Sequence, residues 1–297
     1  MSASRTVLVT GASGQQGHAV AEALLQRGYK VRAFTRKADN AAIQQLTAMG
    51  AEVAVGDFAD PEHVSAAATG TDAAFLMGTP LEAGVAGETR QGIAAADAIK
   101  VAGVGHLIYS SVASANQNTG IPHFESKYAV EKHIARLGIP FTISAPVAFM
   151  ENGVAPWSID GLRKGVLNAT TPAERRQQLV AVADIGAFVA SLVERRETVF
   201  GQRYDIAGDG LTGTRQAEIV SEVLGRPIAY YGVPPDVVRQ YQGEDQALMA
   251  EWFDKVGYSA DIPRLRRDFP EVGWHSYTEW AKGFDWSVVA AEPVQVA

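Results

Sequence analysis

The chain has 297 residues, of which 47% are hydrophobic and 20% charged, so a sizeable folded core can form and intrinsic disorder is disfavoured. Its formal net charge of −7 and the lack of a long basic run disfavour a nucleic-acid partner, because such a surface needs concentrated Lys and Arg. There is no cysteine, which excludes a disulfide framework, a thiol nucleophile and a thiolate metal site.

The first predicted element is a strand at residues 6–10, and a glycine-rich turn follows it directly. Gly11, Gly14 and Gly17 have the spacing G-x-x-G-x-x-G, and a helix is predicted over 15–27. Such a turn presents backbone N–H groups and a positive helix end to a pyrophosphate, although an ordinary βα turn is the alternative. Gly11 permits the tight turn, Gly14 the approach of the phosphates, and Gly17 close helix–strand packing. We expect these turn residues to contact a dinucleotide: Gly11, Ser13, Gly14, Gln15, Gln16 and Gly17.

The first half of the chain alternates short apolar strands with helices. The predicted strands are 6–10, 30–35, 51–55, 72–77, 105–110 and 140–144. The predicted helices are 15–27, 39–49, 60–68, 85–102 and 123–137. This alternation predicts a doubly wound α/β (Rossmann) domain over residues 1–150, with a parallel sheet covered by helices on both faces.

The second strand ends in two cations, Arg36 and Lys37, and no acidic residue occurs before Asp39. A carboxylate at this point would favour NAD by binding the ribose 2′-OH, whereas cations suit the 2′-phosphate of NADP(H). We therefore expect Arg36 and Lys37 to select NADP(H). The alternative is a solvated Arg-Lys pair near a helix start, where cations are disfavoured.

Residues after the third and fourth strands are further candidates for coenzyme contacts. Asp57 and Phe58 are placed to meet the adenine end, although Asp57 could equally be a loop residue with no ligand role. Met77, Gly78 and Thr79 should flank the adenosine ribose and the pyrophosphate.

After about residue 150 the alternating pattern gives way to helices with shorter strands between them. Helices are predicted at 184–196, 212–224, 235–257 and 276–283, and strands at 166–170, 203–206 and 228–231. Aromatic residues gather here, and each of them could equally be a core residue. We expect residues 151–297 to form a smaller α+β substrate-binding lobe, not strictly contiguous, that packs over the carboxyl edge of the sheet.

Two short segments toward the end of the first half carry the remaining candidates, Pro122–Glu131 and Ile143–Asn152, and the second of them reaches into the start of the lobe. Together with Thr10–Gly17, Arg36 and Gly56–Phe58, they make the chain resemble the NmrA-like group of atypical short-chain dehydrogenases/reductases. The matching positions in the two segments are His123, Ser126, Lys127, Val130, Glu131 and Phe149–Asn152. The resemblance covers most of the chain, but it does not select a substrate.

In this superfamily the working pattern is Tyr-x-x-x-Lys with an upstream Ser or Thr, where Tyr transfers a proton and Lys holds the nicotinamide ribose. The resemblance implies that Lys127 contacts that ribose and that His123 stands in place of the Tyr. The upstream hydroxyl position falls at Val112, between Ser111 and Ser114. An imidazole can donate a proton near neutrality, but a neighbouring Lys⁺ disfavours the charged ring. His123 is therefore the proton donor, a neutral polarising group or a wall of the pocket.

The resemblance also places Pro146 and Phe149 beside the nicotinamide, with Pro146 fixing the turn and Phe149 packing near the ring. Family members commonly carry Arg-Pro where this chain has Ala145 and Pro146. Trp157 is a candidate wall of the substrate pocket. The histidines show no metal-ligand spacing, so we expect no metal site.

We expect an NADPH-dependent oxidoreductase that transfers hydride to a small or medium apolar acceptor, such as a quinone, carbonyl, imine or activated alkene. The loss of Tyr favours acceptors that need little proton donation, quinones above all. The alternative function is a non-catalytic NADP(H)-binding redox sensor or regulator, since the NmrA-like group includes such members. Residues 1–5 are too short and polar for a signal peptide, and no run of about 18 apolar residues predicts a membrane span. We therefore expect a cytoplasmic monomer or homodimer with no membrane partner.

Overall fold

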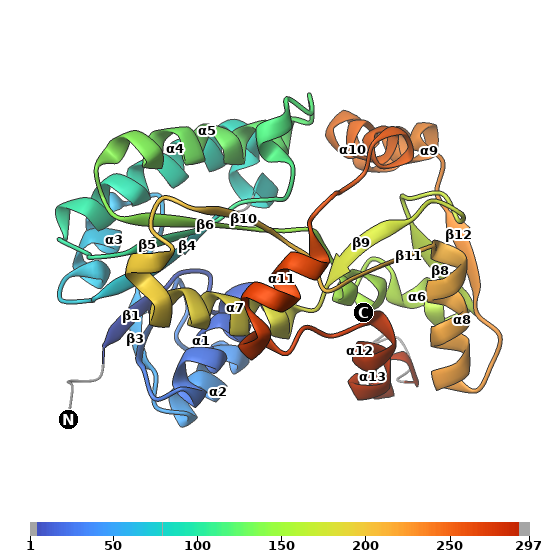
Figure 1. Ribbon diagram of the computed structural model, residues 1–297, viewed down its shortest axis with the longest axis horizontal. Coiled ribbons are helices and arrows are strands. Elements are labelled where there is room, and N and C mark those ends of the chain that lie inside the picture. Colours follow the sequence, from blue (N-terminus) through green and yellow to red (C-terminus); the bar gives the residue numbers. More distant parts are fainter. Residues whose placement is uncertain (1–4, 79, 291–297) are drawn as a thin grey trace. The chain divides into compact units, whose positions relative to one another are not determined.

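The computed structural model describes residues 5–78 and 80–290, and the chain divides into two compact units (Figure 1). The first unit comprises Met1–Pro146, Val182–Ile206 and Arg264–Gly273. The second comprises Val147–Ala181, Ala207–Pro263 and Trp274–Ala297. The first unit therefore consists of the chain up to Pro146 and two later segments. A single boundary at residue 150 does not describe this division.

The first unit is built on a seven-stranded sheet in which every pairing is parallel. Its strand order is β10-β6-β5-β4-β1-β2-β3, which confirms the predicted doubly wound Rossmann fold. The strand order reverses between β1 and β4, and ligands bind at the carboxyl ends of the strands at such a switch point. The strands are β1 (Thr6–Val9), β2 (Lys30–Thr35), β3 (Glu52–Val55), β4 (Ala73–Met77), β5 (Leu107–Ser110), β6 (Phe141–Pro146) and β10 (Arg203–Ile206).

The predicted strand at 203–206 is this β10, so it belongs to the main sheet and not to the smaller lobe. It pairs with β6 in the register Ile143 to Arg203, and thereby extends the sheet at the edge opposite β3. The local sequence predicted the strand itself correctly. Its assignment to the smaller lobe was wrong, because its partner β6 lies about 60 residues earlier in the sequence and belongs to the main sheet.

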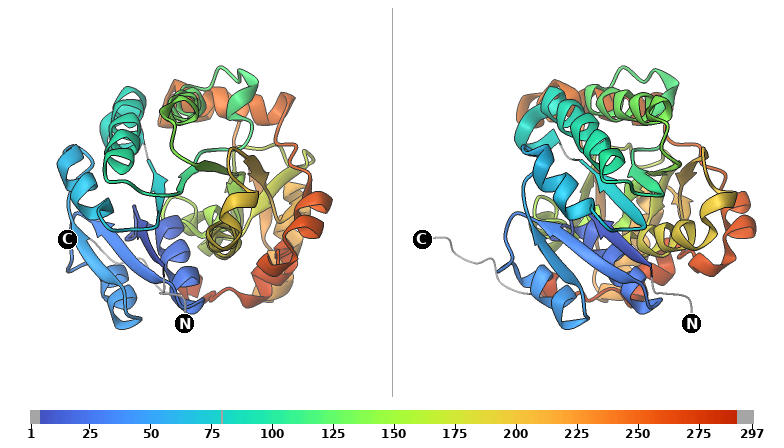
Figure 2. Two further views of the ribbon diagram at one scale, coloured as in Figure 1. Left: turned by 60° about the vertical axis from the view of Figure 1, so that its left-hand side comes forward. Right: turned by 90° about the vertical axis from the view of Figure 1, so that its left-hand side faces the viewer.

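Helices cover both faces of the sheet, with α3, α4 and α5 on one side and α1, α2 and α7 on the other (Figures 1 and 2). Glycines let two helix pairs approach closely. A Cβ at Gly92 of α4 would lie 2.8 Å from Val130 Cγ2 of α5, and one at Gly186 of α7 would overlap the backbone of Ala19 in α1. The helices are α1 (Gln15–Gln26), α2 (Ala41–Ala48), α3 (Pro61–Ala68), α4 (Pro80–Val101), α5 (Pro122–Leu137), α7 (Val182–Arg195) and α11 (Ile262–Asp268), the last beginning in the second unit.

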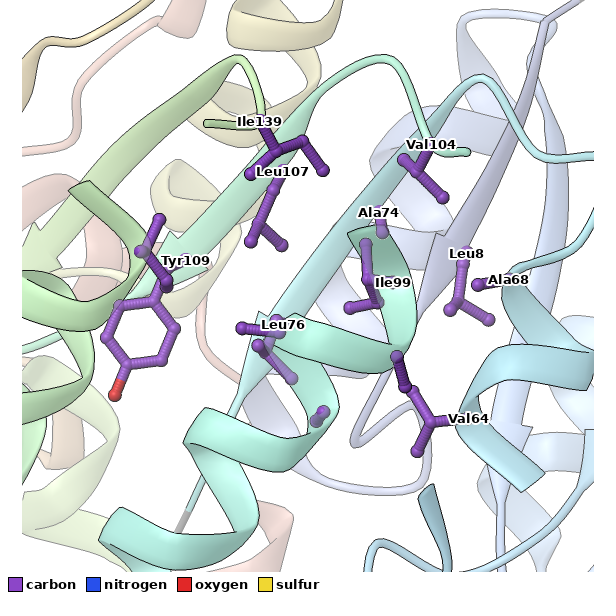
Figure 3. Packing of buried hydrophobic residues seen from close by; sticks show 14 of the residues in the cluster. Leu8, Val64, Ala68, Ala74, Leu76, Ile99, Val104, Leu107, Tyr109 and Ile139 are labelled. Atoms are coloured by element: carbon purple, nitrogen blue, oxygen red, sulfur yellow. The ribbon is translucent and has the colours of Figure 1, made fainter. Parts of the chain in front are cut away.

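One core cluster of the first unit lies between the sheet and helices α3 to α5 (Figure 3). Strands of a parallel sheet are buried on both faces, so they read as continuous apolar runs, and Ala73–Leu76 is one of these. Tyr109 of β5 is buried in the same cluster, and its phenol ring ends in a polar atom (Figure 3). The labelled members are Leu8, Val64, Ala68, Ala74, Leu76, Ile99, Val104, Leu107, Tyr109 and Ile139.

The second unit contains a three-stranded sheet of order β11-β9-β7 and a pair β12-β8. The predicted single helix at 235–257 is wrong, because Gly243 has a φ of 88° and separates two helices. The strands are β7 (Ala148–Phe149), β8 (Val166–Ala169), β9 (Gln177–Val180), β11 (Asp209–Leu211) and β12 (Ala229–Gly232). The helices are α6 (Ile159–Arg163), α8 (Gly213–Leu224), α9 (Pro235–Gln242), α10 (Glu244–Lys255), α12 (Tyr277–Gly283) and α13 (Ser287–Ala290).

Within the described part of the chain, none of the helices combines the length and the apolar character that crossing a bilayer requires.

Candidate functional site

A cleft of about 250 Å³ lies at the carboxyl ends of β1 to β4, in the first unit. Eight residues that the sequence predicted as coenzyme contacts line it: Gly11, Ser13, Gly14, Arg36, Asp57, Phe58, Met77 and Gly78. The cleft is also lined by residues that were not predicted as contacts, on β2, after β3, on β4 and on α4: Phe34, Thr35, Gly56, Leu76, Ala83, Glu88, Gln91 and Gly92.

The glycine turn has the geometry that a dinucleotide-binding turn requires. Gly11 has a φ of 65°, and a Cβ there would lie 2.7 Å from Met77 Sδ. The Gly14 N–H donates to the Gly11 carbonyl at 2.9 Å, and a Cβ on Gly17 would overlap that same carbonyl. Only glycine fits these close approaches, so the turn is folded tightly and the start of α1 lies against it.

The N-terminus of α1 is electrostatically suited to an anion. Gly14 is the N-cap and offers no side-chain hydrogen bond, and the first turn holds no acidic residue. The first backbone N–H groups of a helix lack intrahelical acceptors and carry partial positive charge. The chemistry of this turn therefore fits a phosphate group.

The glutamines of this turn differ in their surroundings. Gln15 is exposed, whereas Gln16 is buried and its side-chain carbonyl accepts a hydrogen bond from the Ser110 hydroxyl at the end of β5. That contact joins the start of α1 to the end of β5, which is separated from β1 by β4 in the sheet. A coenzyme contact by Gln16 would therefore use its backbone N–H, since the side chain is occupied.

Thr10 also fixes the turn, and the sequence reading overlooked it. Its hydroxyl donates to the Phe75 carbonyl at 3.0 Å and accepts the Met77 N–H at 3.0 Å. These bonds join the ends of β1 and β4, the two strands that flank the switch point. A threonine at the last position of a predicted strand, directly before a glycine turn, was the only signal for it.

Arg36 lines the side of the cleft next to β2 and β3, and its side chain is exposed. Lys37 is exposed beside it but does not line the cleft, and its N–H donates to the Thr35 hydroxyl at 3.3 Å. No acidic residue stands at the end of β2, so a cation has the position where a carboxylate would bind a ribose 2′-OH.

Asp57 and Phe58 form the cleft wall after β3. Phe58 packs edge-on against Phe34 with ring centroids 5.5 Å apart, which supplies an apolar surface suited to a flat ring. Asp57 Oδ1 accepts the Ala59 N–H at 2.9 Å, so this carboxylate shapes its own loop. Thr79, the last predicted residue of the β4 end, lies outside the described residues.

Lys127 lies on α5 and is held by a buried ion pair. Its Nζ is 2.6 Å from Glu88 Oε1 of α4 and donates to the Gly78 carbonyl at 3.2 Å. Ser126 donates to the other oxygen of Glu88 at 2.5 Å. Glu88 was missed by the sequence reading, because nothing distinguishes it from other acidic residues in a predicted helix until α4 packs on α5.

His123 lies four residues before Lys127 on α5, so the two share one face of that helix. The ring is half-buried and packs edge-on against Phe124 at 4.8 Å between centroids. Its backbone carbonyl accepts a hydrogen bond from Ser126 at 3.0 Å. A proton-transfer role for His123 stays a prediction.

The loop after β5, where the superfamily pattern has its hydroxyl residue, is held by a polar cluster. Ser111 donates to Glu131, whose carboxylate binds Arg203 at 2.9 Å between Oε2 and Nε. Arg203 also donates to the Val112 carbonyl at 2.9 Å and pairs with Asp205. Burial alone would lower the pKa of Arg203, but the two carboxylates outweigh it and raise that pKa. The cluster ties this loop to α5 and β10 at the carboxyl edge.

Ser114 completes the same loop, with a φ of 64° that non-glycine residues seldom adopt. Its N–H donates to Asp205 at 3.2 Å, which holds the strained backbone in place. Ser111 therefore has a structural partner, and Val112 contributes its backbone carbonyl to the cluster.

Tyr109 is the tyrosine next to this region, but its chemistry does not suit proton transfer. Burial raises the pKa of its phenol well above the ordinary value, and the carboxylates of Glu88 and Glu131 raise it further. The group therefore keeps its proton, and it does not replace the tyrosine that is absent at position 123.

The two residues expected beside the nicotinamide belong to different units. Pro146 is the last residue of β6, and its carbonyl accepts the Ala113 N–H at 3.0 Å. Phe149 ends β7 in the second unit and pairs in register with Val180 of β9. Trp157 is 75% exposed in that unit. Their coenzyme and substrate contacts stay predictions.

No group of three His, Asp or Glu side chains that could hold a metal ion occurs among the residues that the structure describes.

Comparison with known proteins gives a consistent result at the sequence level. The sequence model of the NmrA-like family matches residues 3–284. An NmrA-like family domain-containing protein of Dictyostelium discoideum is 24% identical over 273 residues, covering 86% of this chain and 89% of that protein. The NAD(P)H azoreductase of Xenophilus azovorans is 26% identical over 235 residues, covering 79% of each.

Solved structures share the fold at low identity. NmrA, a negative transcriptional regulator in complex with NADP, has a TM-score of 0.77 at 20% identity, covering 96% of this chain and 99% of that one. The Citrobacter sp. triphenylmethane reductase complexed with NADP(H) has a TM-score of 0.79 at 21% identity, covering 93% and 99%. The Escherichia coli quinone oxidoreductase complexed with NADPH has a TM-score of 0.76 at 24% identity, covering 93% and 98%.

Proposed function

The chain belongs to the NmrA-like family, and from this premise we propose that it is an NADPH-dependent oxidoreductase that reduces a small or medium apolar acceptor. One observation carries the proposal: a single cleft unites a glycine turn, an uncapped helix N-terminus and Arg36, with no acid at the end of β2. Those features suit a pyrophosphate and a 2′-phosphate together.

The residues present fit NADP(H) in shape as well as in charge. Glycines occupy the turn positions where a Cβ would fill the space or strain the backbone, which leaves a cradle of backbone N–H groups for the pyrophosphate. Arg36 would bind the 2′-phosphate through its guanidinium, and Phe58 would offer its apolar wall to the adenine. The assignment of NADP(H) as the coenzyme is supported by one relative that is named as an NAD(P)H azoreductase. It is also supported by structural neighbours solved with bound NADP(H).

The bound coenzyme supplies the hydride, and the chain supplies position and electrostatics. Lys127 would donate to a hydroxyl of the nicotinamide-side ribose, and the polar cluster around Arg203 keeps the neighbouring loop in place. His123 would donate a proton to acceptors that need one. With no tyrosine at that position, acceptors that need little proton donation, such as quinones, are favoured over ketones and aldehydes.

The test is NADPH oxidation against a panel of quinones, aldehydes, ketones, imines and enones, with wild type and His123→Phe compared. We expect turnover to be fastest with quinones, and the variant to lose carbonyl reduction by about tenfold or more while quinone reduction changes little. An unchanged carbonyl rate in the variant would remove the proton-donor role of His123. The absence of turnover with every acceptor would contradict the enzyme assignment.

The second candidate function is a non-catalytic NADP(H) sensor. It is favoured by the replacement of both the tyrosine and the upstream hydroxyl residue by His123 and Val112, and by the likeness to NmrA, named as a negative transcriptional regulator. Tight NADPH binding without turnover across the acceptor panel would support it.

A further inference from the structure

We propose that Glu88 is a positioning residue, which holds the ammonium of Lys127 at the carboxyl end of β4 so that it meets the nicotinamide-side ribose. The inference rests on the proposed function, because it concerns how the chain would hold that ribose. Neither the family pattern nor the sequence reading assigns a role to Glu88.

The position of Glu88 needs an explanation beyond stability. Glu88 is 2% exposed, yet it lines the cleft instead of lying in the apolar core. A buried ion pair contributes less to stability, as a rule, than well-packed apolar side chains of the same volume. A charge kept at the wall of a ligand cleft is therefore better explained by what it holds there.

The surrounding contacts fix Glu88 from three sides. Ser126 donates to Oε2 at 2.5 Å, and Lys127 donates to Oε1 at 2.6 Å. A Cβ at Gly78 would lie 3.3 Å from Glu88 Cγ, so the glycine leaves room for the carboxylate next to the strand end. The side chain is therefore held by Ser126, by Lys127 and by the chain at Gly78, directly after β4.

The contacts of Lys127 leave one of its N–H donors available for a ligand. An ammonium has three N–H donors. One goes to Glu88 and one to the Gly78 carbonyl, so a single donor is left without a partner among the described residues. A free lysine side chain rotates about four bonds, but this one is held before any ligand arrives, which lowers the entropy lost on binding.

The place of the pair in the sheet decides which half of a dinucleotide it would meet. Arg36 and Asp57 follow β2 and β3, whereas Gly78 follows β4, and β1 lies between these two sides. The 2′-phosphate and adenine would lie on the β2–β3 side. Glu88 and Lys127 lie on the β4 side, toward β5, where the nicotinamide-side ribose would follow the pyrophosphate.

The experiment compares two probes, NADPH and adenosine 2′,5′-bisphosphate, which lacks the nicotinamide ribose. Both are titrated into wild type, Glu88→Ala, Glu88→Gln, Lys127→Ala and the Glu88→Ala/Lys127→Ala double variant. Arg90→Ala is the matched control, since Arg90 is exposed on the same helix and does not line the cleft. Binding of the bisphosphate also reports whether each variant has folded.

We expect Glu88→Ala and Lys127→Ala each to weaken NADPH by about tenfold or more, the loss of one charge-assisted hydrogen bond. Glu88→Gln should lose less, since the amide keeps an acceptor for Lys127. Affinity for the bisphosphate should stay within about twofold, and the double variant should be no worse than Lys127→Ala, because the two residues act as one unit.

Three results would overturn the proposal: unchanged NADPH affinity in Glu88→Ala, equal losses for both probes, or additive losses in the double variant. If Glu88→Ala does not bind the bisphosphate because it fails to fold, the same criteria apply to Glu88→Gln. Failure of the proposed function is distinguishable. A chain that does not use NADP(H) would bind neither probe as wild type, and a non-catalytic sensor would bind both probes but turn over no acceptor.

Discussion

Arg36 is the residue on which the choice between the two nicotinamide coenzymes depends. Arg36→Ala removes the guanidinium that would bind the 2′-phosphate, and it leaves the glycine turn intact. We expect the dissociation constant for NADPH to rise by about tenfold to 100-fold and that for NADH by less than about threefold. Titration followed by coenzyme fluorescence measures both constants.

Lys37→Ala is the matched control for Arg36→Ala, since Lys37 is adjacent but does not line the cleft. Its effect on NADPH should be small. Equal losses of NADPH and NADH in Arg36→Ala would show that the arginine does not read the 2′-phosphate.

His106 makes the folding free energy depend on pH. Its Nε2 lies 2.9 Å from Thr142 Oγ1, and Thr142 donates its proton to the Val199 carbonyl at 2.9 Å. The ring must therefore donate from Nε2, which leaves Nδ1 as a buried acceptor with no partner among the residues that the structure describes. Burial, and then the charge of Arg196, lower the pKa of His106 to about 4.

Because the folded state disfavours the protonated ring, the contribution of His106 to stability is complete above pH 6.5 and decreases as the pH falls toward 4. The loss should reach about 3 kcal/mol. Urea unfolding of wild type and His106→Asn at pH 7.5 and 4.5 measures it, since the variant does not titrate. A stability difference between the two proteins that is the same at both pH values would contradict this pKa.

At the scale of elements, the strands of the first half could be predicted because they are buried on both faces. Runs such as Val7–Val9 and Ala73–Leu76 contain no polar residue, and glycines end the helices between them. The short strands β9 and β11 lack such runs, since polar residues such as Gln177, Gln178 and Asp209 interrupt them, and β7 is only two residues long. A glycine with positive φ at position 243 broke one long amphipathic pattern into two helices.

The Arg203 cluster joins three elements, α5, β10 and the loop after β5, so its loss should destabilise them together. Arg203→Ala leaves the Glu131 carboxylate, whose side chain is 6% exposed, without its cation. We expect a decrease in the free energy of unfolding of about 3 to 5 kcal/mol. Urea denaturation gives the value.

Arg27→Ala is the control for this prediction, since its pair with Glu194 is more exposed and should contribute about 1 kcal/mol or less. The variant Arg203→Met/Glu131→Leu should recover part of the loss by removing both charges. A loss in Arg203→Ala as small as that in the control would show that the cluster does not hold the three elements together.

At the scale of the whole molecule, the strand-end residues of the cleft could be predicted from the sequence, whereas the pairing of Glu88 with Lys127 could not. Gly11, Arg36, Asp57 and Met77 lie at strand ends or within two residues after them, so finding the strand ends was enough to bring them together at one edge. Glu88 meets Lys127 only because α4 packs on α5. That contact depends on tertiary structure, and no local pattern in the chain encodes it.

The decisive measurement is the thermal unfolding midpoint of the whole chain with NADPH, with NADH and without coenzyme. A coenzyme that binds only the folded protein stabilises it by about 2.7 kcal/mol at 100 times its dissociation constant, which raises the midpoint by several degrees. We expect that rise with NADPH, and a smaller one with NADH at the same concentration. A midpoint that neither coenzyme changes at millimolar concentration would contradict coenzyme binding at the cleft, and with it the proposed oxidoreductase function.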